Sequence, residues 1–327
     1  MRELSFMEAT LEGLSEEMAR DPMVFVVGEG IGARGGNFNT TVGLFDRFGP
    51  ERLRDTPISE RGFTGLCTGA AMVGARPIVD YMFFDFALDA LGELINQTAK
   101  IQYMSDGRLT MPIVLRGCIG VASSAATHHS GSYYSLFTHF PGFRVVVPTT
   151  PRDAKGLLKT AIRSDDPVCF MEHRSLLGTR GPVPEDEELI PFGQARVARP
   201  GSDVTVVGIS YMVNLALAAA EALDADGQTI SVEVIDPRTL APLDIDTILE
   251  SVHKTGRLLI VDQSFAPCGI GAEIAAQVTD RGFDDLDAPV RRLNGAHTPT
   301  PYSPPLESAV VPNQDSIVQA IRELVAE

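Results

Sequence analysis

The sequence predicts an α/β protein of two domains, each built on a mostly parallel sheet flanked by helices. Short apolar runs alternate with stretches of helical periodicity in both halves of the chain, which is the pattern of parallel strands joined by crossover helices. Residues 179–200 interrupt this alternation with glycines, prolines and acidic residues, as expected of an interdomain linker. We therefore predict domains over 1–180 and 203–327, joined by a linker over 181–202.

The first domain is expected to begin with an amphipathic helix and to continue with buried strands. Ser5 and Glu8 have the spacing of a capping box, which starts a helix that ends near Asp21. The predicted strands are short apolar runs, at 23–27, 78–84, 112–116, 143–147 and 168–171. Helical periodicity predicts helices at 61–74, 86–104, 131–139 and 151–163.

The second domain repeats the alternation on a smaller scale. Its predicted strands are the apolar runs at 204–209, 230–235, 258–261 and 290–293. Its predicted helices start near Tyr211, Ile245, Gly271 and Asn313. No residue of this half indicates chemistry by itself, so the candidate site is sought in the first domain.

Composition excludes several classes of partner. A formal net charge of −16 over 327 residues disfavours nucleic acid and anionic membranes, which repel an acidic surface. No segment reaches the roughly 18 apolar residues of a membrane-spanning helix. The cysteines lie far apart, without zinc spacing or a disulfide framework, which favours a reducing cytoplasm; they are Cys67, Cys118, Cys169 and Cys268.

Candidate functional residues follow the predicted strands of the first domain. Because ligands bind beyond the carboxyl ends of parallel strands, such residues are expected at one edge of the sheet. They are two carboxylates, an aromatic residue, an arginine and two histidines: Glu29, Asp85, Phe86, Arg116, His128 and His129. The histidines have no partner at zinc-ligand spacing, so zinc is not predicted.

Glu60 is a further candidate, because it is a charge at the start of a Gly- and Ala-rich helix behind the proline turn of residues 55–60. Glu60 either takes part in chemistry or only complements the helix dipole. Its position in the sequence does not decide between these two roles. The glycine-rich stretch 28–36 lacks the Gly-Lys-Ser/Thr of a phosphate loop. We interpret it as a flexible loop near a ligand.

A series of motifs along nearly the whole chain carries a family resemblance. The motifs are Val-Gly-Glu (27–29), Arg-Phe-Gly-Pro-Glu-Arg (47–52), Asp-Thr-Pro-Ile-Ser-Glu (55–60), Phe-Phe-Asp-Phe (83–86), His-Ser-Gly-Ser (129–132), Phe-Pro-Gly-Phe-Arg-Val-Val-Val-Pro (140–148), Asp-Ala-Lys-Gly-Leu-Leu (153–158), Val-Ile-Asp-Pro-Arg-Thr-Leu-Ala-Pro-Leu-Asp (234–244) and Pro-Tyr-Ser-Pro-Pro-Leu-Glu (301–307). With them the chain closely resembles the β subunits of thiamine-diphosphate-dependent 2-oxo acid dehydrogenases. Those subunits are similar to the pyrimidine-binding and C-terminal domains of transketolase.

The resemblance implies roles for individual residues. The glutamate that matches Glu60 hydrogen-bonds a ring nitrogen of the aminopyrimidine and so helps to activate the cofactor. Phe86 matches the aromatic residue on the pyrimidine ring, with Ile58 and Met82 as its other neighbours. His129 matches the histidine near the reacting carbon, where it assists acyl transfer.

Glu29 and His128 are also compared with the family pattern. Glu29 matches an acidic residue of the proton path between active sites, which makes it a cofactor-site residue. His128 departs from the family pattern, and either changes what enters the site or is a surface residue.

The resemblance also implies partners and ions. The Gly-Asp-Gly motif that seats magnesium and the diphosphate is absent, since 105–108 and 225–228 lack its first glycine. This chain is therefore expected to bind only the pyrimidine half of thiamine diphosphate, with an α subunit holding Mg²⁺ in a heterotetramer of two α and two β chains. The oxygens of a family potassium site align with Ile113, Ala161, Ile162, Ser164 and Asp166.

The implied activity is decarboxylation of a 2-oxo acid and acyl transfer to lipoamide, with a lipoyl acyltransferase as a further partner. Two alternatives stay open. The first is a two-subunit enzyme that joins the acyl unit to an aldehyde or cleaves acetoin. The second is a scaffold subunit without catalysis, which the presence of Glu60, Phe86 and His129 disfavours.

Overall fold

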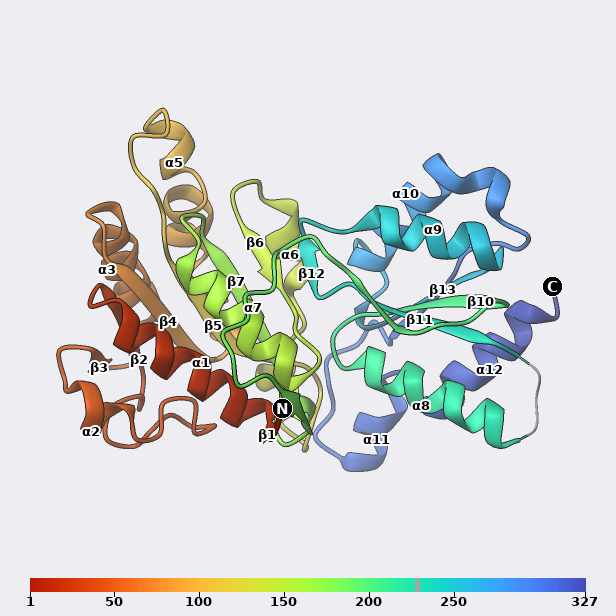
Figure 1. Ribbon diagram of the computed structural model, residues 1–327, viewed down its shortest axis with the longest axis horizontal. Helices are drawn as coiled ribbons and strands as arrows, with labels where there is room; N and C mark the ends of the chain where they lie inside the picture. The colour runs from red at the N-terminus through yellow and green to blue at the C-terminus, as the bar shows by residue number, and fades with distance from the viewer. Residues whose placement is uncertain (227–229) are drawn as a thin grey trace. The chain divides into compact units, whose positions relative to one another are not determined.

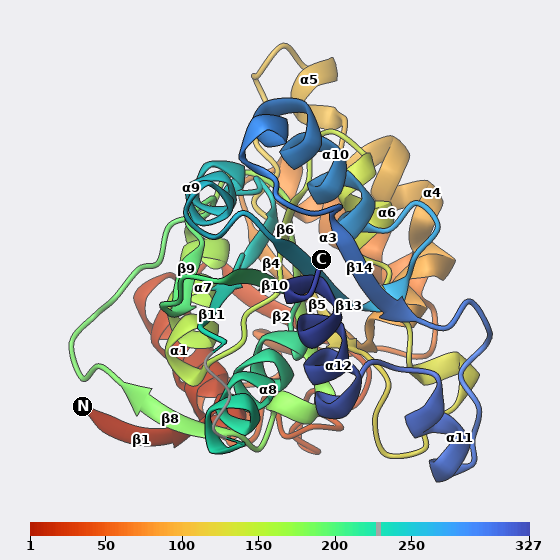
Figure 2. The same cartoon turned by 90° about the vertical axis from the view of Figure 1, so that its right-hand side faces the viewer.

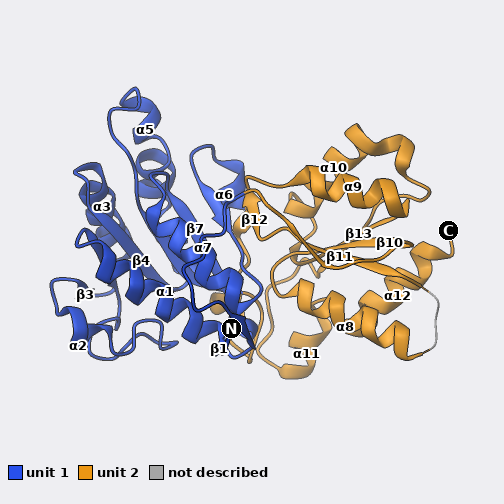
Figure 3. Cartoon of the chain, in the orientation of Figure 1, with its two compact units in different colours: residues 1–119, 136–192 blue, residues 120–135, 193–327 orange. Residues whose placement is uncertain are grey.

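The computed structural model describes residues 1–226 and 230–327, and the string at 225–228 extends outside this part of the chain. The chain forms two compact units (Figure 3): unit 1 contains Met1–Ile119 and Leu136–Phe192, and unit 2 contains Gly120–Ser135 and Gly193–Glu327. Each unit is a mostly parallel sheet flanked by helices, so the predicted fold class is confirmed. Across the described ranges, no helix has both the length and the apolar character needed to cross a membrane.

The sheet of unit 1 is parallel throughout. Within this unit the strand order is β6-β7-β5-β4-β2-β3. The strands are β2 (Val24–Gly28), β3 (Leu53–Asp55), β4 (Arg76–Phe83), β5 (Val114–Ile119), β6 (Arg144–Val146) and β7 (Val168–His173). The short β3 was not predicted, because two of its three residues are exposed and polar.

The helices of unit 1 cover both faces of this sheet (Figures 1 and 2). Helices α1 (Phe6–Arg20) and α7 (Pro151–Arg163) pack together on one face, and α3 (Glu60–Met72) lies on the other. The predicted capping box starts α1, since the Ser5 hydroxyl accepts from Glu8 N at 3.1 Å and Ser5 N donates to Glu8 Oε2 at 2.7 Å. The shorter helices are α2 (Leu44–Phe48), α4 (Leu91–Glu93), α5 (Ile101–Met104) and α6 (Tyr134–His139).

Alternation along β4 explains why both faces are covered. Ile78 belongs to the core formed with α1 and α7, and successive side chains of a strand point to opposite faces. Tyr81 accordingly lies under α3, where its ring centroid is 5.8 Å from that of Phe63. The core of unit 1 therefore extends through the sheet on both sides.

One predicted helix, 86–104, is broken into several pieces in the structure. A 3₁₀ helix covers Phe84–Ala90, a π-helical turn covers Leu94–Thr98, and α4 and α5 supply only short α-helical turns. A Cβ atom on Gly117 of β5 would lie 3.0 Å from Phe84 N. The first turn of this segment therefore packs closely on β5. This packing sets the conformation of the turn, and the periodicity of the sequence does not predict it.

Unit 2 has the sheet order β14-β13-β10-β11-β9. Strands β10 (Val204–Gly208), β11 (Val232–Asp236), β13 (Leu258–Phe265) and β14 (Arg291–Gly295) are parallel, and β9 (Arg196–Arg199) is an antiparallel edge. Helices α8 (Met212–Ala225) and α12 (Gln314–Val325) cover one face, and α9 (Ile245–Thr255) and α10 (Ile270–Gly282) cover the other (Figures 1 and 2). The remaining elements are β12 (Thr239–Ala241) and α11 (Pro304–Ala309).

A small antiparallel ladder lies outside the two large sheets. Strand β1 (Arg2–Ser5) pairs with β8 (Arg180–Val183), inside the stretch expected to start the linker. Neither strand has the alternating apolar pattern that would have predicted it. The ladder joins the start of α1 to the segment that follows β7.

Candidate functional site

The residues predicted to bind a cofactor come together at one edge of the unit 1 sheet. Glu29 follows β2, Ile58 and Glu60 follow β3, Met82 lies near the end of β4, and Phe86 is in the 3₁₀ helix after β4. Strands β3, β2 and β4 are neighbours in a parallel sheet, so their carboxyl ends lie side by side. The topology thus gathers the five residues at the edge where ligands of α/β proteins bind.

Two carboxylates without counter-charges define the electrostatics of this edge. Glu60 is the first residue of α3 and is half-buried, like Glu29. Neither carboxylate makes a hydrogen bond or ion pair with another residue in the described ranges. Burial, and then the charge of Glu60, raises the pKa of Glu29. A half-buried carboxylate whose pKa is raised, as that of Glu29 is, suits exchange of a proton with a ligand.

The backbone at Met82 is strained, and a buried carboxylate supports it. Met82 has a φ of 61° and lies in a register shift of the β4–β5 ladder between Asp80 and Phe83. The Asp80 side chain accepts from Met82 N at 2.9 Å and from the Thr40 hydroxyl at 2.9 Å. Strain of this kind persists where its surroundings fix it, and it gathers at functional sites. Asp80 was not predicted, although a carboxylate inside an apolar strand is visible in the sequence.

Aromatic rings provide the apolar part of the site. The ring of Phe86 lies edge-on to Phe83 with centroids 6.1 Å apart, and Phe38 contacts Phe83 at 5.2 Å. The guanidinium of Arg174 lies 5.3 Å from the centroid of Phe83, a cation–π contact. Ile58 is 81% exposed. An exposed aliphatic side chain at the same sheet edge as an aromatic cluster suits contact with a flat, partly apolar ligand.

The glycine-rich loop 28–36 differs from the flexible loop that we expected. Gly36 N donates to Gly30 O at 2.8 Å, and Gly32 N donates to Asp55 Oδ1 at 3.1 Å. A Cβ atom on Gly32 would lie 2.4 Å from Asp55 Oδ2. The glycines therefore allow close packing against β3, and the loop is tied to the sheet.

Arg116 was expected to face the site, and the structure buries it instead. Its Nε and Nη2 atoms donate to the two carboxylate oxygens of Glu172 on β7, at 2.6 and 2.9 Å. The side chains are only 2% and 1% exposed. Burial lowers the pKa of Arg116, but the charge of Glu172 outweighs it and raises that pKa above the ordinary value. This pair is part of the interior, out of reach of a ligand.

Two of the predicted potassium ligands accept hydrogen bonds from an arginine. Nη1 of Arg76 donates to the carbonyl oxygens of Ile162 at 3.0 Å and of Ser164 at 2.9 Å. Nη2 of the same side chain pairs with Asp165 Oδ1 at 2.5 Å. A guanidinium group therefore supplies positive charge where potassium was expected.

The other three predicted ligands are engaged as well. The carbonyl oxygen of Ile113 accepts a strand hydrogen bond at 2.9 Å, and that of Ala161 accepts from Ser164 N at 3.2 Å. The Asp166 carboxylate accepts from Arg144 Nε and Nη2 at 3.0 and 2.6 Å. Over the described ranges, no group of three or more His, Cys, Asp or Glu side chains is arranged to hold a metal ion.

His128 and His129 belong to unit 2, within the loop Gly120–Ser135. His128 is exposed and His129 is half-buried, at the end of a 3₁₀ turn over Thr127–His129. The turn follows three residues with positive φ, namely Ser123 (54°), Ser124 (54°) and Ala126 (61°). Backbone strain before the histidines again indicates a functional loop.

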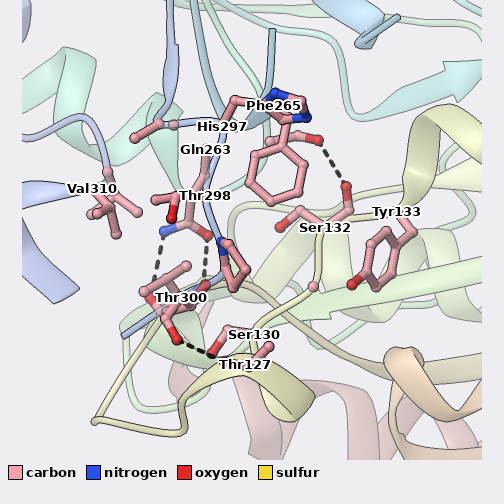
Figure 4. Close-up of a pocket in the computed structure, with 17 residues that line it drawn as sticks. Thr127, Ser130, Ser132, Tyr133, Gln263, Phe265, His297, Thr298, Thr300 and Val310 are labelled. Atoms are coloured by element: carbon pink, nitrogen blue, oxygen red, sulfur yellow. Dashed lines mark hydrogen bonds between the residues drawn. The ribbon is translucent and has the colours of Figure 1, made fainter. Parts of the chain in front are cut away.

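Unit 2 also contains a cavity of about 300 Å³ (Figure 4). One wall is the loop Gly120–Ser135 and the others are the carboxyl ends of β13 and β14. Two of its lining residues, Phe265 and His297, contact each other, with ring centroids 5.5 Å apart. The prediction that this half carries no functional signal missed the cavity, although Asp262-Gln263-Ser264 directly follow an apolar run.

Comparisons with known proteins cover both units. The family model of the transketolase pyrimidine-binding domain matches residues 2–180, and that of the transketolase C-terminal domain matches residues 193–317. A pyruvate dehydrogenase E1 component subunit beta from Rickettsia felis is 46% identical over 98% of both chains. The beta subunit of an acetoin:2,6-dichlorophenolindophenol oxidoreductase from Cupriavidus necator is 44% identical, over 98% of this chain and 97% of that one.

The fold is similar to that of a solved split-gene transketolase, an inactive β4 tetramer. The match has a TM-score of 0.80 and covers 99% of this chain and 98% of the other, at 22% identity. At that identity the likeness concerns the fold alone.

Proposed function

Because the chain belongs to the family of β subunits of thiamine-diphosphate-dependent 2-oxo acid dehydrogenases, we propose that it decarboxylates a 2-oxo acid together with an α subunit and passes the acyl group to lipoamide. The observation that carries this proposal is the pair of half-buried carboxylates, Glu29 and Glu60, which have no partner in the described ranges and lie at the same sheet edge as the aromatic cluster. Thiamine diphosphate, when bound, supplies the electron sink that decarboxylation needs.

The residues at this edge fit the pyrimidine half of the cofactor. Glu60 is proposed to hold a proton at a ring nitrogen, since its carboxylate has no other partner in the described ranges. Phe86 is proposed to pack on the ring, with Ile58 and Met82 against its edges. Glu29, whose pKa is raised by burial and by the charge of Glu60, is proposed to exchange protons with Glu60. His129 is proposed to assist transfer of the acyl group.

The diphosphate half requires a second chain. The sequence lacks Gly-Asp-Gly, so we propose that an α subunit holds Mg²⁺ and the phosphates, in a heterotetramer of two α and two β chains. We propose no potassium ion, because Arg76 already donates to two of the carbonyl oxygens concerned. The four free cysteines favour a reducing compartment, which we propose is the cytoplasm.

A lipoyl acyltransferase has a suitable surface on unit 2. A groove along α10 is lined by the acidic Asp280 and Asp287 and by Phe283, which is 69% exposed. An exposed aromatic anchor with an acidic rim suits a basic domain, which charge complementarity would steer to it. We propose this groove as the docking site.

The first test is calorimetric titration of thiamine diphosphate with Mg²⁺. The titration is done on this chain alone and on the chain purified with its α partner. We expect tight binding only in the mixture, since half of the site comes from each chain. Tight binding to this chain alone would contradict the split site.

The second test is Glu60→Gln in the reconstituted complex. Loss of a positioned proton donor or acceptor is expected to lower kcat by about 10²- to 10⁴-fold, with KM for the 2-oxo acid nearly unchanged. Asp315→Asn, an exposed carboxylate of unit 2, is the matched control. Full activity of Glu60→Gln would remove the catalytic role and favour a scaffold subunit.

A second candidate function is supported by the acetoin-linked relative. In this case the complex cleaves acetoin or joins the acyl unit to an aldehyde. Lipoamide-dependent acyl transfer, measured against aldehyde acceptors and acetoin with the same preparation, separates the two functions.

A further inference from the structure

The loop that carries His129 belongs with the C-terminal unit, although in sequence it lies within the first domain. Gly120–Ser135 clusters with Gly193–Glu327, while the flanking residues on both sides cluster with unit 1. Its position must therefore be set by contacts inside unit 2.

The Thr127 hydroxyl donates to Thr300 O at 3.1 Å, and the Ser135 hydroxyl accepts from Ile270 N at 2.9 Å. Three consecutive residues at the end of β13 make the other hydrogen bonds to the loop. The side-chain amide of Gln263 accepts from Val121 N at 2.9 Å and donates to Val121 O at 3.4 Å. The Ser264 hydroxyl donates to Ser132 O at 3.0 Å, and Asp262 Oδ1 accepts from the Tyr134 hydroxyl. We call Asp262, Gln263 and Ser264 the clamp. It holds the loop at its beginning, at Val121, and at two positions near its end, Ser132 and Tyr134.

A local irregularity of the strand lets consecutive residues act together. Side chains of a regular strand alternate between opposite faces, which would turn Gln263 away from its two neighbours. The register of β13 against β14 shifts between Asp262 and Phe265. Bulges of this kind re-aim side chains. Ser264 N also donates to Asp262 Oδ1 at 2.8 Å, which fixes the carboxylate toward Tyr134.

Packing does little to hold the loop on the side of the cavity. The cavity of about 300 Å³ lies between the clamp and the loop, and its lining includes Gln263, Ser264 and Ser130–Tyr133 (Figure 4). Side chains facing empty space gain no packing that would fix them. On this side the loop is held by hydrogen bonds, namely those of the clamp and that of the Thr127 hydroxyl to Thr300 O at 3.1 Å. A loop with three residues at positive φ needs such a restraint to keep its conformation.

We propose that the clamp positions His129, so that residues of the C-terminal domain set the geometry of the acyl-transfer step. The proposal rests on the proposed role of His129 in that step. Gln263, with two hydrogen bonds to one backbone position, is the principal positioning residue.

The test uses Gln263→Ala in the reconstituted α/β complex. Backbone amides of residues 121–135 are followed by hydrogen–deuterium exchange, and we expect them to exchange about two- to tenfold faster for each hydrogen bond lost. Ser264→Ala, which removes a single bond, is the milder variant, and Ser264→Thr should restore the wild-type exchange. The control is Thr205→Val, which deletes a buried hydroxyl of β10 that bonds only within unit 2, to Ser251 and Thr255.

Kinetics distinguish positioning from mere stability. Misplacement of a catalytic group by about 1 Å can cost about 10²-fold, so Gln263→Ala should lower kcat about tenfold or more while KM for the 2-oxo acid is kept. In a His129→Ala background the same substitution should change kcat by less than about twofold. An equal loss in both backgrounds, or unchanged exchange in the loop, would overturn the proposal.

The role proposed for His129 and the role proposed for the clamp can be refuted separately. If His129→Ala alone kept full activity, the proposed role of His129 would be wrong, yet the exchange data would still report whether the clamp holds the loop. If His129→Ala were inactive and the loop exchanged normally in Gln263→Ala, the clamp alone would be refuted.

Discussion

Asp262 should make stability depend on pH in a direction opposite to that of most carboxylates. It is fully buried, its Oδ2 atom has no partner in the described ranges, and burial raises its pKa to about 6, although its hydrogen bonds from Tyr134 and Ser264 oppose this. The gap between the usual value of 3.8 and about 6 corresponds to about 3 kcal/mol. Between those pH values the folded protein holds a proton that the unfolded chain has lost.

The sign follows from that proton. A folded-state pKa raised above the unfolded value means that this carboxyl favours folding most below pH 3.8, and that its contribution declines until pH is above about 6. Asp262→Asn removes the ionisation. The free energy of unfolding of the variant minus that of the wild type should therefore rise by about 2.5 kcal/mol from pH 4 to pH 7. Constant offsets from the new amide cancel in this difference.

Urea unfolding in one set of buffers across that range measures the difference. Asp315→Asn is the control, since the exposed side chain should change the pH profile little. A difference between Asp262→Asn and wild type that stays flat from pH 4 to pH 7 would refute the reasoning, because it would show that the carboxyl titrates alike in both states.

Three further predictions concern interactions in and near unit 1. Arg116→Met and Glu172→Leu should each lower the free energy of unfolding by about 3 to 5 kcal/mol, because each leaves a buried charge unpaired. In urea titrations the double variant should recover most of this loss, whereas additive losses would contradict the prediction. Replacing K⁺ by tetramethylammonium at constant ionic strength should leave Tm unchanged, whereas a K⁺-dependent rise would show that Arg76 does not take the ion's place. Ser5→Ala should lower stability by about 1 kcal/mol, seen as a lower Tm, by removing the cap of α1; an unchanged Tm would count against it.

Sequence patterns predicted the fold where local and tertiary preferences agree. Helix α1 begins at its predicted capping box, and Pro151 starts α7 as the periodicity indicated. The segment 86–104 failed, since packing of Phe84 on Gly117 overrides helical periodicity there. β13 was predicted to end at Val261 and extends to Phe265, because its last residues are polar and bond to a distant loop.

The candidate site was likewise predictable only in part. The edge of unit 1 was predictable because parallel topology brings Glu29, Met82 and Phe86 together whatever their side chains contact. The fate of Arg116 was not, since its partner Glu172 is 56 residues away and no local pattern pairs them. The clamp was missed for a similar reason: Gln263 and Val121 are 142 residues apart.

The loop Gly120–Ser135 has a consequence for how this protein can be divided. A cut between the two sequence domains, at any point from 181 to 202, would leave the loop on one fragment and the clamp on the other. Chimaeras that exchange the C-terminal half between relatives would likewise pair one parent's clamp with the other parent's loop. The exchangeable module of this chain is thus discontinuous, and residues 120–135 must travel with 193–327.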